Sequence, residues 1–359
     1  MKWGWFLIKL TATTMIEPQI VLQRERMLPQ VGELIGSIGS EVTPMQVVGR
    51  SQIAGGYVVV NASEQLDLAP DMLTAYLRVG EGDLVETGDV LLRRGRWGTK
   101  VVAPAAGRVH AVQNGRLLLQ RPFVWHELRA LLRGTIINQL PQRGVVIETT
   151  GAYIQGRWGT QQEGFGRLRL LTETAEGILT AESWQGELER RVVVAGQVSE
   201  TAVLHQAAEN NIAGLIVGTM PASLIPFAQT LPFPLIVTDG FGQPAMSEII
   251  FNLLKKLDNR ETMLFGKMDE DKGNRPEIIV ATGVPSHQTL RPPAPLAVGQ
   301  TVRLLRQPYA QQLGKVVKLF EQAQALETGI YTPGAAVKLA NGQVVFVPDA
   351  NLDVIQMSG

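Results

Sequence analysis

The sequence predicts a multidomain α+β protein, with β-rich modules at both ends and a three-layer α/β unit with a parallel sheet between them. Three observations predict this class. Short β-type runs separated by glycine turns fill the first third of the chain, strand and helix patterns alternate in residues 190–280, and short strands with tight turns return in residues 297–359. At 359 residues the chain has room for two or three domains with buried cores.

Composition and charge exclude several classes of function. The chain is 45% hydrophobic and 18% charged, as in ordinary globular proteins, and its 33 basic residues balance 33 acidic ones. No cysteine is present for disulfides or thiolate metal sites, and four histidines leave little for imidazole chemistry. In the N-terminal extension, residues 1–27, Lys9 interrupts the apolar run too early for a signal peptide. We therefore expect a cytoplasmic protein that binds no metal and contacts no membrane.

The first module contains an internal repeat. The stretches "LIGSIGSEVTPMQVVGR" and "LRVGEGDLVETGDVLLRR" each read as a glycine turn, a short strand, a second turn and another apolar strand. Neither half can cover its own apolar face, so we expect the two halves to pack together. The alignment pairs Gly39 with Gly82, Val42 with Val85, Val47 with Val90, and Val48 with Leu91.

The pattern "GDLVETGDVLL…VVAPAAGRV" resembles the barrel-sandwich hybrid fold of biotinyl and lipoyl domains and of the Rnf-complex C subunit. The resemblance covers roughly residues 28–120 and implies a module over residues 28–135. In biotinyl carriers the modified lysine stands seven residues before the Ala-Pro pair, where this chain has Arg96. A guanidinium cannot form the amide that attaches biotin or lipoate, and Lys100 lies toward the next strand. We therefore expect the fold without a cofactor.

The middle of the chain changes from β to alternating strand and helix patterns. Residues 136–189 read as a β extension or a connector. Over residues 190–280 the order is strand, helix, strand, short helix, strand, helix. The last helix ends in two lysines, at the end where the helix dipole favours cations. The run "VAGQVSETAVLHQAAENNIAGLIVGTMPASL" resembles the DRTGG-type and other swivelling α/β units in order and rhythm, which implies a fold and no function.

A proline-rich linker over residues 281–296 precedes the last module, residues 297–359. The stretch "GQTVRLLRQPYAQQLGKVV", with Gly299, Pro308 and Gly314 at turn positions, resembles a KOW-type SH3-like barrel, as in NusG-type transcription factors and some ribosomal proteins. Such barrels bind RNA or proteins, and some only pack against their neighbours.

A basic run without an acidic residue is the most charged local feature. Guanidinium groups neutralise phosphates and an exposed indole stacks on bases, so the run is a nucleic-acid candidate. A solvated hairpin, or a contact with an acidic protein, explains the same residues, and we favour the solvated hairpin. The run comprises Arg93, Arg94, Arg96, Lys100, Arg108, Arg116 and Arg121.

The pentapeptide "GRWGT" occurs twice and places Trp97 and Trp158 between glycines, as in a tight turn with an aromatic tip. If both indoles are exposed, they form a candidate site for a protein partner. The alternative, which we favour, is that each indole folds back over a barrel end.

The loops after the parallel strands are the place where an α/β unit would bind a small molecule. Ser199, Thr219, Thr238 and Asp239 are the ligand candidates there, although such residues are also common helix caps. His205 and His287 have no partner at metal-ligand spacing, and no residue is assigned a catalytic role.

Two main functions follow as expectations. The first is a non-catalytic scaffold or adaptor that binds a protein partner through its β modules. The alternative is an RNA- or DNA-associated factor that uses the KOW-like barrel and the basic run. A weaker third reading is a small-molecule sensor or enzyme at the strand ends of the α/β unit.

Overall fold

The computed structural model describes residues 12–95, 98–242, 244–269, 273–326 and 328–357. Its longest element is strand β1 (Ala12–Met27), which belongs to a 17-stranded mixed sheet. β1 pairs antiparallel with β13 (Gly144–Gln155) along most of its length and parallel with β26 (Leu352–Gln356) at its start. One strand therefore joins the two ends of the chain.

The main body is built on one side of β1 by antiparallel and parallel neighbours. β13 pairs with β12 (Gly134–Leu140), which also pairs with β3 (Glu41–Val42), and with β21 (Glu277–Ala281), which pairs with β20 (Glu261–Phe265). β20 pairs with β15 (Glu163–Leu170), and β15 runs parallel to β17 (Arg191–Val198). The sheet continues through β16 (Ile178–Leu179), β18 (Gly214–Met220), β19 (Leu235–Phe241) and β14 (Trp158–Gly159).

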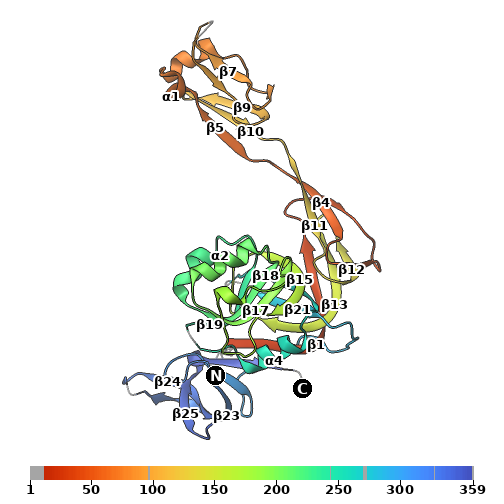
Figure 1. Ribbon diagram of the computed structural model, residues 1–359, viewed down its shortest axis with the longest axis vertical. Helices are drawn as coiled ribbons and strands as arrows, with labels where there is room; N and C mark the ends of the chain where they lie inside the picture. The colour runs from red at the N-terminus through yellow and green to blue at the C-terminus, as the bar shows by residue number, and fades with distance from the viewer. Residues whose placement is uncertain (1–11, 96–97, 243, 270–272, 327, 358–359) are drawn as a thin grey trace, which may run out of the picture.

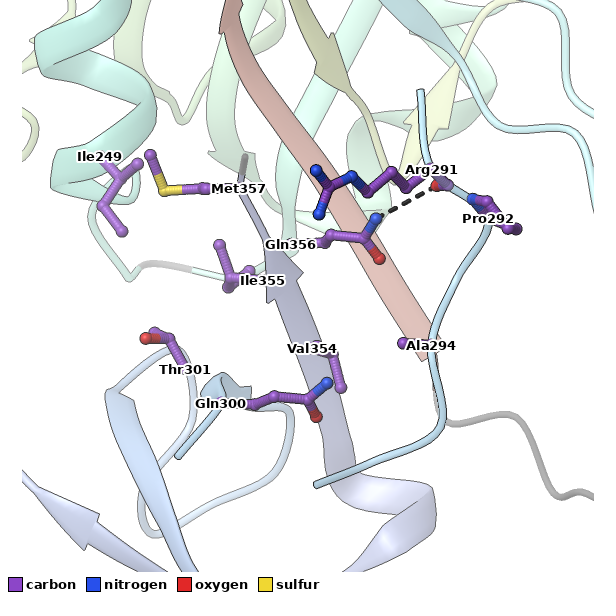
Figure 2. A pocket seen from close by; sticks show the side chains of 10 residues that line it. All are labelled: Ile249, Arg291, Pro292, Ala294, Gln300, Thr301, Val354, Ile355, Gln356 and Met357. Carbon is purple, nitrogen blue, oxygen red and sulfur yellow. Dashed lines mark hydrogen bonds between the residues drawn. The ribbon is translucent and has the colours of Figure 1, made fainter. Parts of the chain in front are cut away.

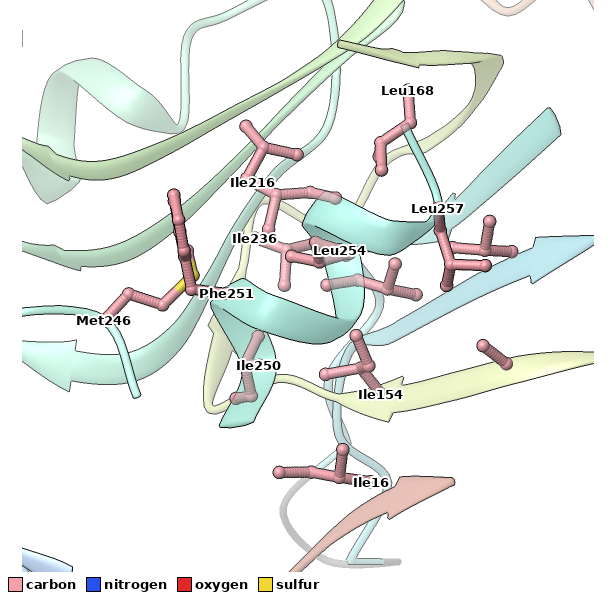
Figure 3. Packing of buried hydrophobic residues seen from close by; sticks show 14 of the residues in the cluster. Ile16, Ile154, Leu168, Ile216, Ile236, Met246, Ile250, Phe251, Leu254 and Leu257 are labelled. Carbon is pink, nitrogen blue, oxygen red and sulfur yellow. The ribbon is translucent and has the colours of Figure 1, made fainter. Parts of the chain in front are cut away.

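Helices cover both faces of the parallel strands. α2 (Thr201–Glu209) packs with residues of η3 (Ala222–Leu224) and α3 (Ile225–Ala228) on one face. On the other face, α4 (Glu248–Lys256) buries Ile250, Phe251 and Leu254 against Ile216 and Ile236 of the sheet (Figure 3). The lysines at the end of α4 lie where the helix dipole favours cations. A short 3-10 turn, η2 (Ala181–Ser183), precedes β17.

The predicted fold class is wrong. The order of strands and helices in residues 190–280 is as expected, but these strands do not form a separate three-layer α/β unit. They continue by hydrogen bonds through β15, β20, β21 and β13 into the same mixed sheet, and most of the regular structure is strand. Hydrogen bonds between distant segments determine which strands share a sheet, and a local sequence pattern does not predict such pairing.

The C-terminal strands also belong to the large sheet. Residues 297–357 contain five strands around their own apolar cluster, as expected for a small β module, but β26 pairs with both β22 and β1. They are therefore not a free-standing barrel. The elements are β22 (Thr301–Leu304), β23 (Leu313–Ala325), β24 (Tyr331–Leu339), β25 (Val344–Pro348), η4 (Asp349–Asn351) and β26.

A stalk rises from the main body. β4 (Val47–Ile53) pairs antiparallel with β11 (Val124–Arg129) over the whole length of both strands, and β2 (Glu33–Leu34) adds a short third strand. Figure 1 shows this ribbon reaching away from the main body. The described residues between β4 and β11 lie beyond it, in what we call the distal lobe, residues 54–123.

The distal lobe has its own sheets and its own core. A four-stranded sheet in the order β5 (Tyr57–Asn61), β10 (Arg116–Gln120), β9 (Gly107–Gln113) and β6 (Leu84–Val85) lies beside the hairpin of β7 (Val90–Arg93) and β8 (Lys100–Val102). α1 (Ala62–Leu66) and η1 (Pro70–Tyr76) complete the lobe, and its apolar side chains form one cluster of their own. We expect the lobe to fold as a unit around that cluster.

The two halves of the sequence repeat pack into different cores, contrary to our expectation. Val42 and Val48 lie in the cluster at the base of the stalk, whereas Val85 and Leu91 lie in the core of the distal lobe. The second copy lies in the segment between β4 and β11. Strand β4 of the first copy therefore pairs with β11, which follows the distal lobe in the sequence. Residues 28–135 thus contain two cores where one was expected.

Because the distal lobe and the main body have separate cores, we expect that the lobe can be destabilised without the body. Leu117→Ala removes a fully buried side chain of the distal lobe and should lower the stability of the lobe by about 2–5 kcal/mol. Hydrogen exchange should then speed up in the amides of β9 and β10 and stay unchanged in β17 and β18, which pack in another cluster. Equal acceleration in both regions would show that the lobe and the body unfold together.

Candidate functional site

Three of the four ligand candidates of the parallel strands are used inside the protein. Thr219 is buried and donates to the carbonyl of Pro244 at 2.6 Å, and buried Thr238 donates to Asp239 Oδ2 at 2.7 Å. Asp239 forms an ion pair with Arg303. Ser199 alone is exposed, just before α2. The structure thus does not gather these four residues around an open site, although their role as ligands stays a prediction.

Arg303 is the centre of a buried charge cluster that joins distant segments. Its side chain has 0% exposure and pairs with Asp239 of β19 and with Asp353 of β26, the latter at 2.6 Å. Burial opposes the charge of Arg303, but the two aspartates outweigh this effect and raise its pKa. The hydroxyl of Thr14, on β1, donates to Asp353 at 2.8 Å.

Two more arginines surround Asp353. Arg157 Nη1 lies 3.1 Å from Asp353 Oδ2, and Arg275 Nη1 lies 3.9 Å from Oδ1. Burial lowers the pKa of Arg157, and the neighbouring arginines lower it further against the attraction of Asp353. We interpret the cluster as a structural junction, since every carboxylate in it is already paired.

Removing the central arginine should therefore be costly. Arg303→Met leaves two buried aspartates without their main partner and should lower the free energy of unfolding by about 3–5 kcal/mol. Arg306→Gln, at an exposed position three residues later, is the matched control and should have almost no effect. Urea unfolding of both variants measures the difference. An Arg303→Met variant as stable as its control would contradict the role of the junction.

The two GRWGT copies lie in different parts of the molecule. Trp97 and Arg96 lie outside the described residues, but their neighbours Gly95 and Gly98 belong to the β7–β8 hairpin of the distal lobe. Trp158 lies on β14 in the main body, half-buried against the α2-side core, with its ring 5.9 Å from that of Phe241. The described residues of the two copies therefore lie in different parts of the fold, and the role of Trp97 and Trp158 in partner binding stays a prediction.

Trp158 should contribute to stability. Trp158→Ala removes part of a core and an edge-to-face ring contact and should lower the free energy of unfolding by roughly 2 kcal/mol. Trp125→Ala is a suitable control, because Trp125 is 59% exposed. Chemical unfolding of the two variants tests this. Equal free energies of unfolding would show that Trp158 contributes no more to stability than the exposed Trp125.

The basic run is divided between two sheets of the distal lobe. Arg93 and Lys100 face each other across the β7–β8 hairpin, and Arg94 next to them donates weakly to the carbonyl of Leu66. Arg108 and Arg116 lie on β9 and β10 of the four-stranded sheet, and Arg121 follows β10; all three are exposed. The structure therefore places Arg93 and Lys100 on the two-stranded sheet and Arg108 and Arg116 on the four-stranded sheet.

The outer face of that sheet is the candidate site. Cross-strand registers place Leu84, Arg108, Gln120 and Tyr57 side by side across the four strands, and Leu118 beside Val59 in a neighbouring row. The opposite face carries the core, because side chains alternate along a strand. Leu84 is 75% exposed and Tyr57 is 52% exposed. We call these residues, with His110 and Arg116, the docking face.

The docking face has a distinctive chemistry. Its described outward positions on β5, β6, β9 and β10 include apolar, aromatic and basic side chains and no acidic one. The ring of Tyr57 lies 5.1 Å from that of His110. A shallow hollow of about 340 Å³ adjoins Leu84 and Arg108, and it includes Arg121, Phe123 and one acid, Glu86. Sequence analysis missed Tyr57, Val59 and Leu84, because an exposed valine or leucine in a strand looks like core.

A second hollow, of about 430 Å³, lies between α4, residues 291–294 and the start and end of the C-terminal strands (Figure 2). Figure 2 shows the amide of Gln356 beside Arg291, whose carbonyl it reaches as a donor at 3.1 Å, and Gln300 farther along the hollow beside Val354. Its described lining has one charged residue and no nucleophile paired with a base, so it suggests no reaction.

Clustered metal ligands and membrane-spanning helices are both absent from the described parts of the chain. No group of three or more His, Asp or Glu side chains there is placed to hold a metal ion. No described helix has the length and apolar character needed to cross a bilayer. Comparison with known protein families and with curated proteins finds no match for this chain. Function is therefore inferred from the chemistry of the site.

Proposed function

We propose that this protein is a non-catalytic scaffold or adaptor, and that the docking face of the distal lobe binds an acidic, partly apolar segment of a partner protein. The observation that carries the proposal is the exposure of Tyr57, Val59 and Leu84 beside Arg108 and Arg116, with no acid among the outward positions. Aromatic residues and arginine are the side chains that protein interfaces favour, and contiguous exposed apolar surface marks such interfaces.

The position of the face supports the proposal. The stalk of β4 and β11 holds the lobe away from the main body (Figure 1), so a partner can approach the sheet without meeting the body. The apolar surface continues beyond the sheet at Phe123 and Val124, both more than half exposed. The cations would attract an acidic partner and orient it on the face. The cytoplasmic location expected from the sequence remains a prediction.

Nucleic acid is the second candidate, because Tyr57 and His110 in ring contact beside arginines could stack on bases. Val59, Leu84 and Leu118 favour protein over nucleic acid, since aliphatic side chains offer bases no stacking surface. Direct titration with mixed single-stranded RNA separates the two candidates: tight binding that falls steeply with salt would favour RNA.

The test removes the apolar part of the face. In affinity capture at near-physiological salt, the double variant Tyr57→Ser/Leu84→Ser should lose a partner that the unchanged protein retains. With that partner purified, the double variant should bind it about tenfold or more weakly than the unchanged protein does. Both side chains are exposed, so the melting temperature should stay nearly constant.

Met72→Ser is the matched control, because Met72 is 51% exposed but lies on η1 rather than on the sheet. It should retain the partner in full. Retention by the double variant, or an equal loss in the control, would contradict the assignment of the docking face. Arg108→Glu should weaken binding further and reduce its dependence on salt.

A further inference from the structure

A third hollow, an open cleft, lies on the main body, in a different part of the chain from the distal lobe. It has a volume of about 360 Å³, within the range of small-molecule sites. Three arginines line it from three separate segments: Arg133 just before β12, Arg167 on β15, and Arg260 just before β20. The other lining residues are Thr150, Glu261, Ala281 and Gly283.

The fold brings these groups together by strand pairing. Arg167 of β15 stands opposite Glu261 of β20 in the register, and Thr150 and Ala281 lie close together where β13 pairs with β21. Arg133 reaches Glu261 with two parallel hydrogen bonds, at 2.8 and 2.9 Å. Such a bidentate pair fixes both side chains.

The charges in the cleft do not cancel. Three arginines face one glutamate, which leaves a surplus of two positive charges among the lining residues. The hydrogen bonds from Arg133 lower the pKa of Glu261, so this carboxylate is ionised and already occupied. Arg167 donates one bond, to the carbonyl of Asn259 at 3.0 Å. Within the described residues, the Arg260 guanidinium has no hydrogen-bond or ion-pair partner.

Two arginines next to the cleft already have partners. On the neighbouring surface, Arg191 donates to Asn259 at 2.9 Å and Arg169 lies 3.7 Å from Asp258. These arginines are therefore engaged, and one of them is neutralised. A long polyanion needs cations along its whole path, whereas the arginines of this cleft converge on one place. The geometry suits a compact dianion.

We propose that this cleft binds the phosphate group of a small phosphate monoester, held by Arg167 and Arg260 with Arg133 and the Thr150 hydroxyl beside it. Guanidinium groups match phosphate oxygens in shape and remain charged at all physiological pH values. The site makes the protein a receptor for a small molecule as well as for a partner, and its existence does not depend on the docking face.

Calorimetric titration of the full chain with inorganic phosphate at constant ionic strength tests the proposal. The expected result is binding in the millimolar range or tighter, with chloride inert, and tighter binding for at least one member of a panel of phosphate monoesters. Arg260→Gln and Arg167→Gln should each weaken phosphate binding about tenfold or more. Both positions are exposed, so the variants should fold.

Arg143→Gln is the control, because Arg143 is an exposed arginine at the turn between β12 and β13 and does not line the cleft. It should bind phosphate like the unchanged protein. Absence of phosphate binding, or equal losses in all three variants, would overturn the proposal. Tighter binding of a short single-stranded RNA than of any monoester, lost in Arg260→Gln, would also overturn it and assign the cleft to nucleic acid.

Discussion

The architecture depends on the burial of one guanidinium. Arg303 enters the interior from β22, and its charge is tolerated only because Asp239 and Asp353 arrive from two other strands. Those strands belong to the main body and to the end of the chain, so the ion pairs fix the C-terminal strands against the body. Thr14 of β1 binds the same carboxylate, which brings the start of the described chain into this junction.

The distal lobe is attached to this body in a very different way. Two paired strands form the stalk, and the apolar cluster of the lobe shares no residue with the cluster at the base of the stalk. The molecule thus has two parts: a main body whose segments are joined by buried ion pairs, and a distal lobe that the two-stranded stalk connects to it. The docking face lies on the lobe and the arginine cleft lies on the body, so the two proposed binding functions would have separate locations.

Local sequence patterns predicted elements better than they predicted packing. The glycine turns of the repeat are real, since Gly39 and Gly82 both have the positive φ that such turns need. The rhythm after residue 190 gave the right order of strands and helices. What it could not show is that β15 continues the sheet toward β20, or that the two repeats serve different cores, because both depend on pairing between distant segments.

The candidate sites show the same limit. Asp239 follows a buried strand, as a ligand residue would, but its partner Arg303 comes 64 residues later in the sequence. The acid-free basic run was visible in the sequence, and the structure divides it between two sheets. The strand registers show that the exposed Tyr57 and Leu84 lie beside this run. The residues that line the cleft show that Arg133, Arg167 and Arg260 converge. Neither arrangement can be read from the sequence.

Site-specific photo-crosslinking in the protein's own cells tests the central claim most directly. A photoreactive amino acid at position 84, on the docking face, should crosslink to one reproducible protein, and the same amino acid at position 72 should not. Mapping of the crosslinked peptide should then find an acidic, partly apolar segment. No crosslink at position 84, or equal crosslinks at both positions, would contradict the account of the distal lobe as the partner-binding part of the molecule.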